Sequence, residues 1–321
     1  MKAIKIVNSL PLFSDCAEPQ GSGVLVRVVS SSICGTDLHL LPTGMLEGLI
    51  PGHECAGYTP DGKAVAIEPF HSCGSCLACA DGLIAHCQAQ DLPTVSGLTR
   101  DGGMAESVLV PEASLVELPT GLDVRIANLV ETLAVCVRGF SRCGLNSKDK
   151  VLVIGAGSIG LGSAACLQAW GMDFAVKARY PHQQAAAEQL GASLNVGDGY
   201  DLVIDAVANE KSMEEAVNCA KPDGRILILG NFWETTPIVP ELCQKELTII
   251  TSIAYKCTQP NRSFVEAASI LFEHPHIADA MITHRFPLDG AAEAFATAAD
   301  KSSGAIKVTF DVAPARRSVR C

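Results

Sequence analysis

The amino-acid sequence predicts an α/β fold that combines a doubly wound parallel sheet with a second, β-rich domain. Residues 1–120 consist of short β-branched runs separated by Gly and Pro turns, and Val24–Val29 is one example. From about residue 125 onward, short apolar runs that fit buried strands alternate with helical stretches, which is typical of a parallel sheet. The length of 321 residues fits about two domains.

The apolar runs define the expected strands, and the segments between them define the helices. We expect strands at residues 151–154, 174–176, 202–204, 226–229 and 246–251 and helices at residues 181–190 and 212–220. The uncharged stretch 151–172 contains five glycines, so we interpret it as a strand, a tight turn and a buried helix rather than a membrane span. The last segment predicts helices at 262–273 and 291–299 and strands at 282–286 and 305–312. The expected domains are residues 1–128, residues 129–256 and a return to the first domain at residues 257–321.

Charge and cysteine content argue against several classes of protein. The formal net charge of −11 is unfavourable for a nucleic-acid partner, and the basic cluster of Arg316, Arg317 and Arg320 is too short to change this. Fourteen cysteines in a chain whose start lacks a signal-peptide core indicate a reducing compartment, by default the cytoplasm. In such a compartment clustered cysteines are typical of metal sites rather than of disulfides.

A glycine-rich turn follows the first expected strand of the second domain. Gly155 permits the tight turn, Gly157 lets the backbone approach a pyrophosphate, and Gly160 allows close packing of helix on strand. Ser158 and Ile159 open the helix, whose N-terminal N–H groups face the anion. This strand–turn–helix context predicts a Rossmann-type dinucleotide site.

The end of the second strand indicates which dinucleotide binds. NAD sites usually place Asp or Glu there to accept a hydrogen bond from the adenosine ribose. The segment Val176–Tyr180 of this chain has no carboxylate. Lys177 and Arg179 suit a 2′-phosphate, although both also fit solvated surface cations. The pattern favours NADP(H) over NAD(H).

Four cysteines lie close together in the first domain. Cys73, Cys76, Cys79 and Cys87 form a C-x2-C-x2-C-x7-C pattern in a Gly-containing loop. Four thiolates at this spacing favour a closed, tetrahedral Zn²⁺ site, which leaves no position for a substrate. The alternatives are four free thiols, which would be prone to oxidation, or a redox pair, although no single C-x2-C pair stands apart.

A second group of candidate ligands is sparser. The segment Cys34-Gly-Thr-Asp-Leu-His39 is followed by Gly52-His53-Glu54. A cysteine and a histidine at this separation carry little weight alone. Together with Thr36, Asp37 and Glu54 they supply candidate zinc ligands, hydrogen-bond partners for those ligands and a proton path, which an open catalytic site needs.

In this order, the two cysteine-containing groups and the glycine turn resemble the zinc-dependent medium-chain dehydrogenases/reductases, the superfamily of alcohol and polyol dehydrogenases. The resemblance covers nearly the whole chain, through Gly304-Ala-Ile-Lys-Val308. It implies a GroES-like catalytic domain before the Rossmann-type domain and one catalytic and one structural zinc. It also implies NAD(P)-dependent hydride transfer between an alcohol or polyol and its carbonyl counterpart, in a homodimer or homotetramer.

Carried over to this chain, the resemblance makes Cys34 and His53 ligands of the catalytic zinc. Glu131 matches the third ligand of the polyol-dehydrogenase-like branch, where the glutamate is usually followed by a proline that this chain lacks. The resemblance implies that Glu54 approaches the metal or supports its ligands, and that Asp37 orients His53 or its neighbours.

The resemblance also implies a mechanism. Zinc polarises the substrate oxygen so that an alkoxide forms near neutral pH, and hydride passes to the nicotinamide. Thr36 takes the first proton and passes it through the nicotinamide ribose to His39 and solvent. Three alternatives stay open: a metal-free quinone or enoyl reductase of the same superfamily, a zinc-stabilised binding protein without activity, and a catalytically degenerate member.

Nine cysteines belong to neither group, among them Cys136, Cys166 and Cys321. We assign them no chemistry. Because free cysteine commonly packs as a small hydrophobic residue, we expect most of them to be buried.

Overall fold

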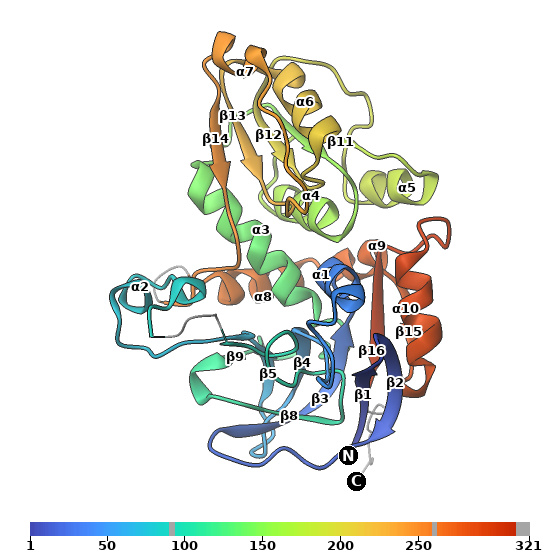
Figure 1. Ribbon diagram of the computed structural model, residues 1–321. Helices are drawn as coiled ribbons and strands as arrows, with labels where there is room; N and C mark the ends of the chain where they lie inside the picture. Colours follow the sequence, from blue (N-terminus) through green and yellow to red (C-terminus); the bar gives the residue numbers. More distant parts are fainter. Residues whose placement is uncertain (90–93, 259–261, 313–321) are drawn as a thin grey trace. The chain divides into compact units, whose positions relative to one another are not determined.

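The computed structural model describes residues 1–89, 94–258 and 262–312 (Figure 1). These residues form two compact units. Unit 1 contains residues 1–89, 94–131, 257–258 and 282–312, and unit 2 contains residues 132–256 and 262–281. The basic cluster of Arg316, Arg317 and Arg320 and the last cysteine, Cys321, lie outside the described residues.

A seven-stranded mixed sheet forms the framework of unit 1, as the short β-branched runs predict. Its strands follow the order β15-β16-β3-β4-β5-β9, and β8 also pairs with β3. The strands are β3 (Val24–Ser32), β4 (Glu54–Tyr58), β5 (Ala64–Ile67), β8 (Ser107–Val110), β9 (Leu115–Glu117), β15 (Ile282–Phe286) and β16 (Lys307–Asp311). Because β16, β3 and β4 are neighbours, residues near both ends of the sequence meet on this sheet.

Smaller elements complete unit 1. Two antiparallel pairs are formed by β1 (Lys2–Val7) with β2 (Leu10–Asp15) and by β6 (Phe70–His71) with β7 (Thr94–Val95). The α-helices are α1 (Gly35–Leu40), α2 (Leu77–Ala80) and α10 (Ala291–Ala299). Short 3-10 turns lie at Leu41–Thr43, Ile84–His86, Glu112–Ser114 and Leu288–Gly290.

The core beneath this sheet is built from both ends of the sequence. Ala291, Ala294 and Phe295 lie at helical spacing on one face of α10, and all three are buried. They share a cluster with Ile4 of β1 and Phe310 of β16. Packing of α10 therefore fixes β16, which carries one of the residues of the site described below.

Unit 2 is a five-stranded parallel sheet with helices around it (Figure 1), which confirms the predicted doubly wound domain. The strand order is β11-β10-β12-β13-β14, for β10 (Val151–Ile154), β11 (Phe174–Lys177), β12 (Tyr200–Asp205), β13 (Ala220–Ile228) and β14 (Thr248–Thr251). The helices of this unit are α4 (Ser158–Ala169), α5 (Pro181–Gln189), α6 (Glu210–Cys219), α7 (Pro240–Gln244), α8 (Ser263–Glu273) and α9 (Ile277–Met281). Helix α3 (Leu129–Cys143) begins in unit 1 and continues into unit 2.

The C-terminal segment differs from the expected domain plan. The sequence predicts a return to the first domain from residue 257, whereas the structure groups α8 and α9 with unit 2. The physical reason is the apolar face of α8, where Phe264 and Leu271 are buried and the ring of Phe264 packs edge-on against Tyr255. The return to unit 1 begins at Ile282. Among the described residues, no helix has the length and apolar character that a bilayer span requires.

Candidate active site and metal centres

Three candidate ligands of the sparser group converge in unit 1. Cys34 directly precedes α1, and His53 directly precedes β4, whose first residue is Glu54. One ligand atom from each of these residues lies within 4.8 Å of the other two. His53 and Glu54 are buried, and Cys34 is partly exposed. A thiol, an imidazole and a carboxylate form a donor set that suits Zn²⁺.

Asp37 contacts both Cys34 and His53 of this group. It is fully buried in α1, and its Oδ2 accepts the backbone N–H of Cys34 over 2.9 Å. Its other oxygen, Oδ1, lies 3.5 Å from Nδ1 of His53. Burial opposes a charge on His53, but the negative charges of Asp37 and Cys34 outweigh it and raise the pKa of the imidazole. Asp37 thus faces both candidate ligands, as expected of a carboxylate that orients metal-binding side chains.

Glu54 is held by a buried ion pair. Nζ of Lys307, on β16, lies 2.8 Å from each of its carboxylate oxygens, and the hydroxyl of Ser32, on β3, donates to Oε2. Burial disfavours the charged carboxylate, but the charge of Lys307 outweighs this and lowers the pKa of Glu54. Neither Lys307 nor Ser32 was expected from the sequence. A lysine inside the apolar strand 305–312 was the available signal, because a buried ammonium requires a partner.

The other candidates of the catalytic group lie nearby on α1 and α3. Glu131, in the first turn of α3, is outside the group of atoms within 4.8 Å. Burial and the charge of Glu54 raise the pKa of the Glu131 carboxyl group to about 7. Thr36 and His39 both lie on the short helix α1, where Thr36 is half-buried and His39 is exposed.

The four clustered cysteines converge as the spacing predicts. One sulfur from each of Cys73, Cys76, Cys79 and Cys87 lies within 4.8 Å of the others. Sγ of Cys79 is 3.8 Å from Sγ of Cys73 and 3.4 Å from Sγ of Cys76. Sulfurs at the corners of a tetrahedron around Zn²⁺, with Zn–S distances of about 2.3 Å, are about 3.8 Å apart. The cluster therefore has the dimensions of a closed zinc site.

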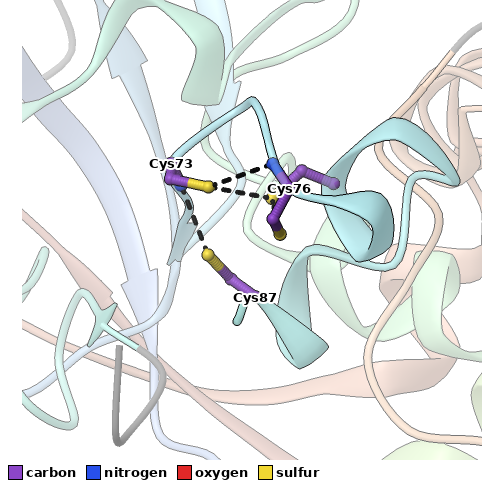
Figure 2. Close-up of side chains that lie close together, drawn as sticks. Cys73, Cys76 and Cys87 are labelled. Carbon is purple, nitrogen blue, oxygen red and sulfur yellow. Dashed lines mark hydrogen bonds between the residues drawn. The ribbon is translucent and has the colours of Figure 1, made fainter. Parts of the chain in front are cut away.

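Backbone N–H groups prepare these sulfurs to carry negative charge. The N–H of Cys76 donates to Sγ of Cys73, and that of Cys73 donates to Sγ of Cys87, each over 3.4 Å (Figure 2). The N–H of Ser75 donates to Sγ of Cys73 over 3.5 Å. Figure 2 also shows that the side chains of Cys73, Cys76 and Cys87 point toward one another. Such donors stabilise thiolates, which are the form that binds zinc.

The glycine turn of unit 2 has the geometry that a dinucleotide site needs. Gly155 has a φ of 91°, which favours glycine. A Cβ at Gly160 would lie 1.9 Å from the carbonyl oxygen of Gly155, so α4 packs against the turn only because residue 160 is glycine. A Cβ at Gly157 would meet no atom within 4 Å, which leaves room beside the backbone for a phosphate. Ser158 and Ile159 form the first turn of α4.

The two cations at the end of β11 differ in their surroundings. Lys177 forms an ion pair with Glu215 of α6. Arg179 is exposed, and its guanidinium lies 5.3 Å from the centre of the Tyr180 ring. From the sequence alone, Lys177 and Arg179 are equivalent candidates for binding a phosphate. The ion pair with Glu215 distinguishes Lys177 from Arg179.

The cysteines outside both groups are less uniformly buried than expected. Cys55, Cys136, Cys143 and Cys166 are buried. Cys243 is exposed, and the three others are partly exposed, namely Cys16, Cys219 and Cys257. The expectation of burial therefore holds for half of the eight that the structure describes.

Comparison with known proteins places the chain in a family. Residues 20–120 match the alcohol dehydrogenase GroES-like domain, and residues 158–272 match the zinc-binding dehydrogenase domain. The chain is 30% identical to L-galactonate-5-dehydrogenase of Escherichia coli K12 over 307 residues, which cover 86% of this chain and 88% of that protein.

Two solved structures extend this comparison. A zinc-binding dehydrogenase from Sinorhizobium meliloti bound to NADP superposes with a TM-score of 0.86 at 26% identity and covers 97% of this chain and 98% of its own. A short chain alcohol dehydrogenase from E. coli CFT073, complexed with NADH, gives a TM-score of 0.85 at 25% identity over 97% of this chain and 99% of its own.

The chain belongs to the zinc-dependent medium-chain dehydrogenases/reductases. The predicted combination of a GroES-like domain with a Rossmann-type domain is confirmed. The protein is an NAD(P)-dependent oxidoreductase of the alcohol dehydrogenase type, which acts on CH–OH groups.

Proposed function

We propose that Cys34, His53 and a carboxylate hold a catalytic zinc in unit 1, and that the protein interconverts a polyhydroxylated alcohol and its carbonyl counterpart. The observation that carries this proposal is the convergence of thiol, imidazole and carboxylate atoms within 4.8 Å of one another. A polyhydroxylated substrate is supported by the similarity to an enzyme of L-galactonate.

The buried polar residues around these ligands hold them in place. Asp37 accepts a hydrogen bond from the backbone of Cys34 and places its other carboxylate oxygen 3.5 Å from Nδ1 of His53. Glu54 is the carboxylate of this group and already accepts three hydrogen bonds from Lys307 and Ser32, so we keep both Glu54 and Glu131, which lies outside the group, as candidates for the third ligand. When bound, zinc polarises the substrate oxygen and the nicotinamide dinucleotide accepts or returns the hydride.

Two side chains of α1 are placed to carry the proton of the substrate hydroxyl to solvent. Thr36 and His39 are three residues apart and therefore lie on one face of this helix. We assign Thr36 as the group that receives the proton and the exposed His39 as the group that releases it to solvent.

The structural zinc belongs to the four cysteines of the loop, and the dinucleotide belongs to the glycine turn of unit 2. We propose NADP(H) as the preferred dinucleotide, because β11 ends without a carboxylate and Arg179 is exposed where a 2′-phosphate would be bound. Lys177 is assigned a lesser role because Glu215 already pairs with it. Reduced zinc thiolates are compatible with a cytoplasmic location, which we also propose.

We further propose that the protein is a homodimer through β14. Within the described residues, β14 is at the edge of its sheet and pairs only with β13. Its Ile249 and the following Ile253 are exposed. A second copy of β14 would extend the sheet at this edge and cover both side chains. Light scattering of the native protein and of Ile249→Lys tests this, and a monomeric native protein would contradict it.

Metal analysis combined with one substitution tests the catalytic assignment. The purified protein is expected to hold about two zinc ions per chain. His53→Ala is expected to lose about one zinc and all turnover with NADP⁺ and polyols while NADPH still binds. His284→Ala is the matched control, because His284 is a histidine of unit 1 outside both metal groups. This variant is expected to keep both zinc ions and full turnover. Full turnover by His53→Ala would remove zinc from the mechanism.

A further inference from the structure

A buried carboxylate in unit 2 has no part in the chemistry proposed above. Asp205 is the last residue of β12 and is fully buried, next to the apolar Val203 and Ile204. A buried aspartate is costly unless hydrogen-bonded, so its contacts indicate what it does. The feature is part of neither metal group.

Asp205 satisfies donors from two separate turns. Its Oδ1 accepts the N–H groups of Val207 and Ala208, each over 2.9 Å, and its backbone carbonyl accepts those of Leu229 and Gly230, each over 3.0 Å. Ala208 has a φ of 56°, a conformation that non-glycine residues rarely adopt. The carboxylate thus fixes the turn after β12 in a strained form, and the backbone carbonyl of Asp205 ties the end of β12 to the turn after β13.

The other carboxylate oxygen fastens the helix that follows. Oδ2 accepts the hydroxyl of Ser212 over 2.9 Å, and Ser212 also forms the capping box of α6 with Asn209. Burial raises the pKa of Asp205, and the N–H groups of Ala208 and Val207 and the hydroxyl of Ser212 oppose this rise. All of these groups belong to unit 2.

The turn held in this way lies against the glycine turn. β10 and β12 are adjacent strands, and Ile154 is in register with Asp205. A Cβ at Gly155 would lie 2.4 Å from Cγ2 of Val207, whose side chain is 42% exposed. Ligands of doubly wound sheets bind at the carboxyl ends of the strands where the strand order reverses, which here is between β10 and β12.

We propose that Asp205 is a positioning residue for the dinucleotide: it sets the turn that presents Val207 as an apolar contact beside Gly155. The inference rests on the proposed function, because it requires that the glycine turn binds NADP(H). Asp205 touches only the protein, and its effect reaches the ligand through Val207.

The test is the NADPH dissociation constant, measured by fluorescence titration on the zinc-loaded protein. Asp205→Ala removes Oδ1, which accepts both N–H groups of the turn, and Oδ2, which accepts the hydroxyl of Ser212, and is expected to weaken NADPH binding about tenfold or more. Asp205→Asn keeps Oδ1 as an acceptor and stays within about threefold of the native value. Val207→Ala weakens NADPH about fivefold through lost apolar contact.

Asp149→Ala is the matched control for stability. Asp149 accepts a hydrogen bond from Arg225 over 2.7 Å and another from the N–H of Asn146 over 2.8 Å. It precedes the amino-terminal end of β10, whereas the glycine turn follows the carboxyl end of that strand. Removal of the Asp149 carboxylate is expected to lower the melting temperature without changing the NADPH dissociation constant. A merely structural role of Asp205 would give the same result as this control.

The outcomes separate the inference from the proposed function. Unchanged NADPH binding by Asp205→Ala, or equal weakening by Ala and Asn at this position, would overturn the inference. If Asp205→Ala does not fold, native-like binding by Val207→Ala overturns it instead. A native protein that binds neither NADPH nor NADH would overturn the proposed function and the inference together, whereas native binding with insensitive variants overturns the inference alone.

Discussion

The ammonium group of Lys307 lies 2.8 Å from each carboxylate oxygen of Glu54. The side chains are 1% and 2% exposed, so each charge is almost completely removed from water. Burial opposes both charges, yet the pairing raises the pKa of Lys307 and lowers that of Glu54. Each of the two groups therefore depends on the other for its charge.

Lys307→Met is expected to destabilise unit 1 by about 3–5 kcal/mol, because it leaves the carboxylate of Glu54 buried without a partner. Urea unfolding measures the change. The double variant Lys307→Met with Glu54→Gln removes both charges and is expected to recover most of the loss. If the double variant loses as much free energy of unfolding as Lys307→Met and Glu54→Gln lose together as single variants, the two side chains are not coupled.

The cations at the end of β11 are expected to contribute unequally to NADPH binding. Arg179→Ala should weaken NADPH about tenfold and NADH by less than about threefold, because only NADPH carries the 2′-phosphate. Lys177→Ala is the matched control and should change neither constant by more than about threefold, since Glu215 already holds its ammonium group. Fluorescence titration with both dinucleotides gives the constants. A larger effect of Lys177→Ala on NADPH would reverse the assignment.

Loss of the structural zinc is expected to affect stability and leave the catalytic metal in place. Cys79→Ser removes one of four ligands and should lower the zinc content by about one ion per chain and the melting temperature by several degrees. Cys219→Ser serves as the control, because Cys219 belongs to neither metal group. Metal analysis and calorimetry give the two readouts. Full zinc content in Cys79→Ser would contradict the four-cysteine site.

Much of the fold follows from local sequence patterns. The strands 151–154 and 282–286 and the helix 291–299 have the predicted bounds. Lys150 and Gly155 border the first strand, Pro287 ends the second, and Gly290 and Asp300 border the helix. β13 begins at Ala220 rather than at 226, because its first residues are polar and turn-like and join the sheet only through the pairing of Tyr200 with Ala220. Pairing between strands is a tertiary contact that a single apolar run does not encode.

The candidate ligands of the sites could be predicted from the sequence, whereas the residues that hold these ligands could not. The candidate ligands were visible because soft donors at short spacing are uncommon without a metal. The partners that hold them were not: Glu54 and Lys307 are 253 residues apart. The contact of Lys177 with Glu215 is also tertiary, so residue type at the strand end predicts two equivalent phosphate ligands and does not show that one of the two cations is already paired.

The buried cysteines of unit 2 are expected to resist alkylation in the native protein. Iodoacetamide reacts with the thiolate, and burial raises the pKa of Cys143 to about 11, so about one thousandth of this thiol is ionised at pH 8. Burial likewise raises the pKa of Cys166. Mass spectrometry of peptides after brief treatment at pH 8 should find Cys143 and Cys166 unmodified in the native protein and modified in urea. Because the thiolate fraction rises about tenfold per pH unit below the pKa, labelling of Cys143 should increase toward pH 10. Equal labelling of Cys143 in native and unfolded protein at pH 8 would show that this thiol is accessible and reactive, and that it does not serve as a buried hydrophobic residue.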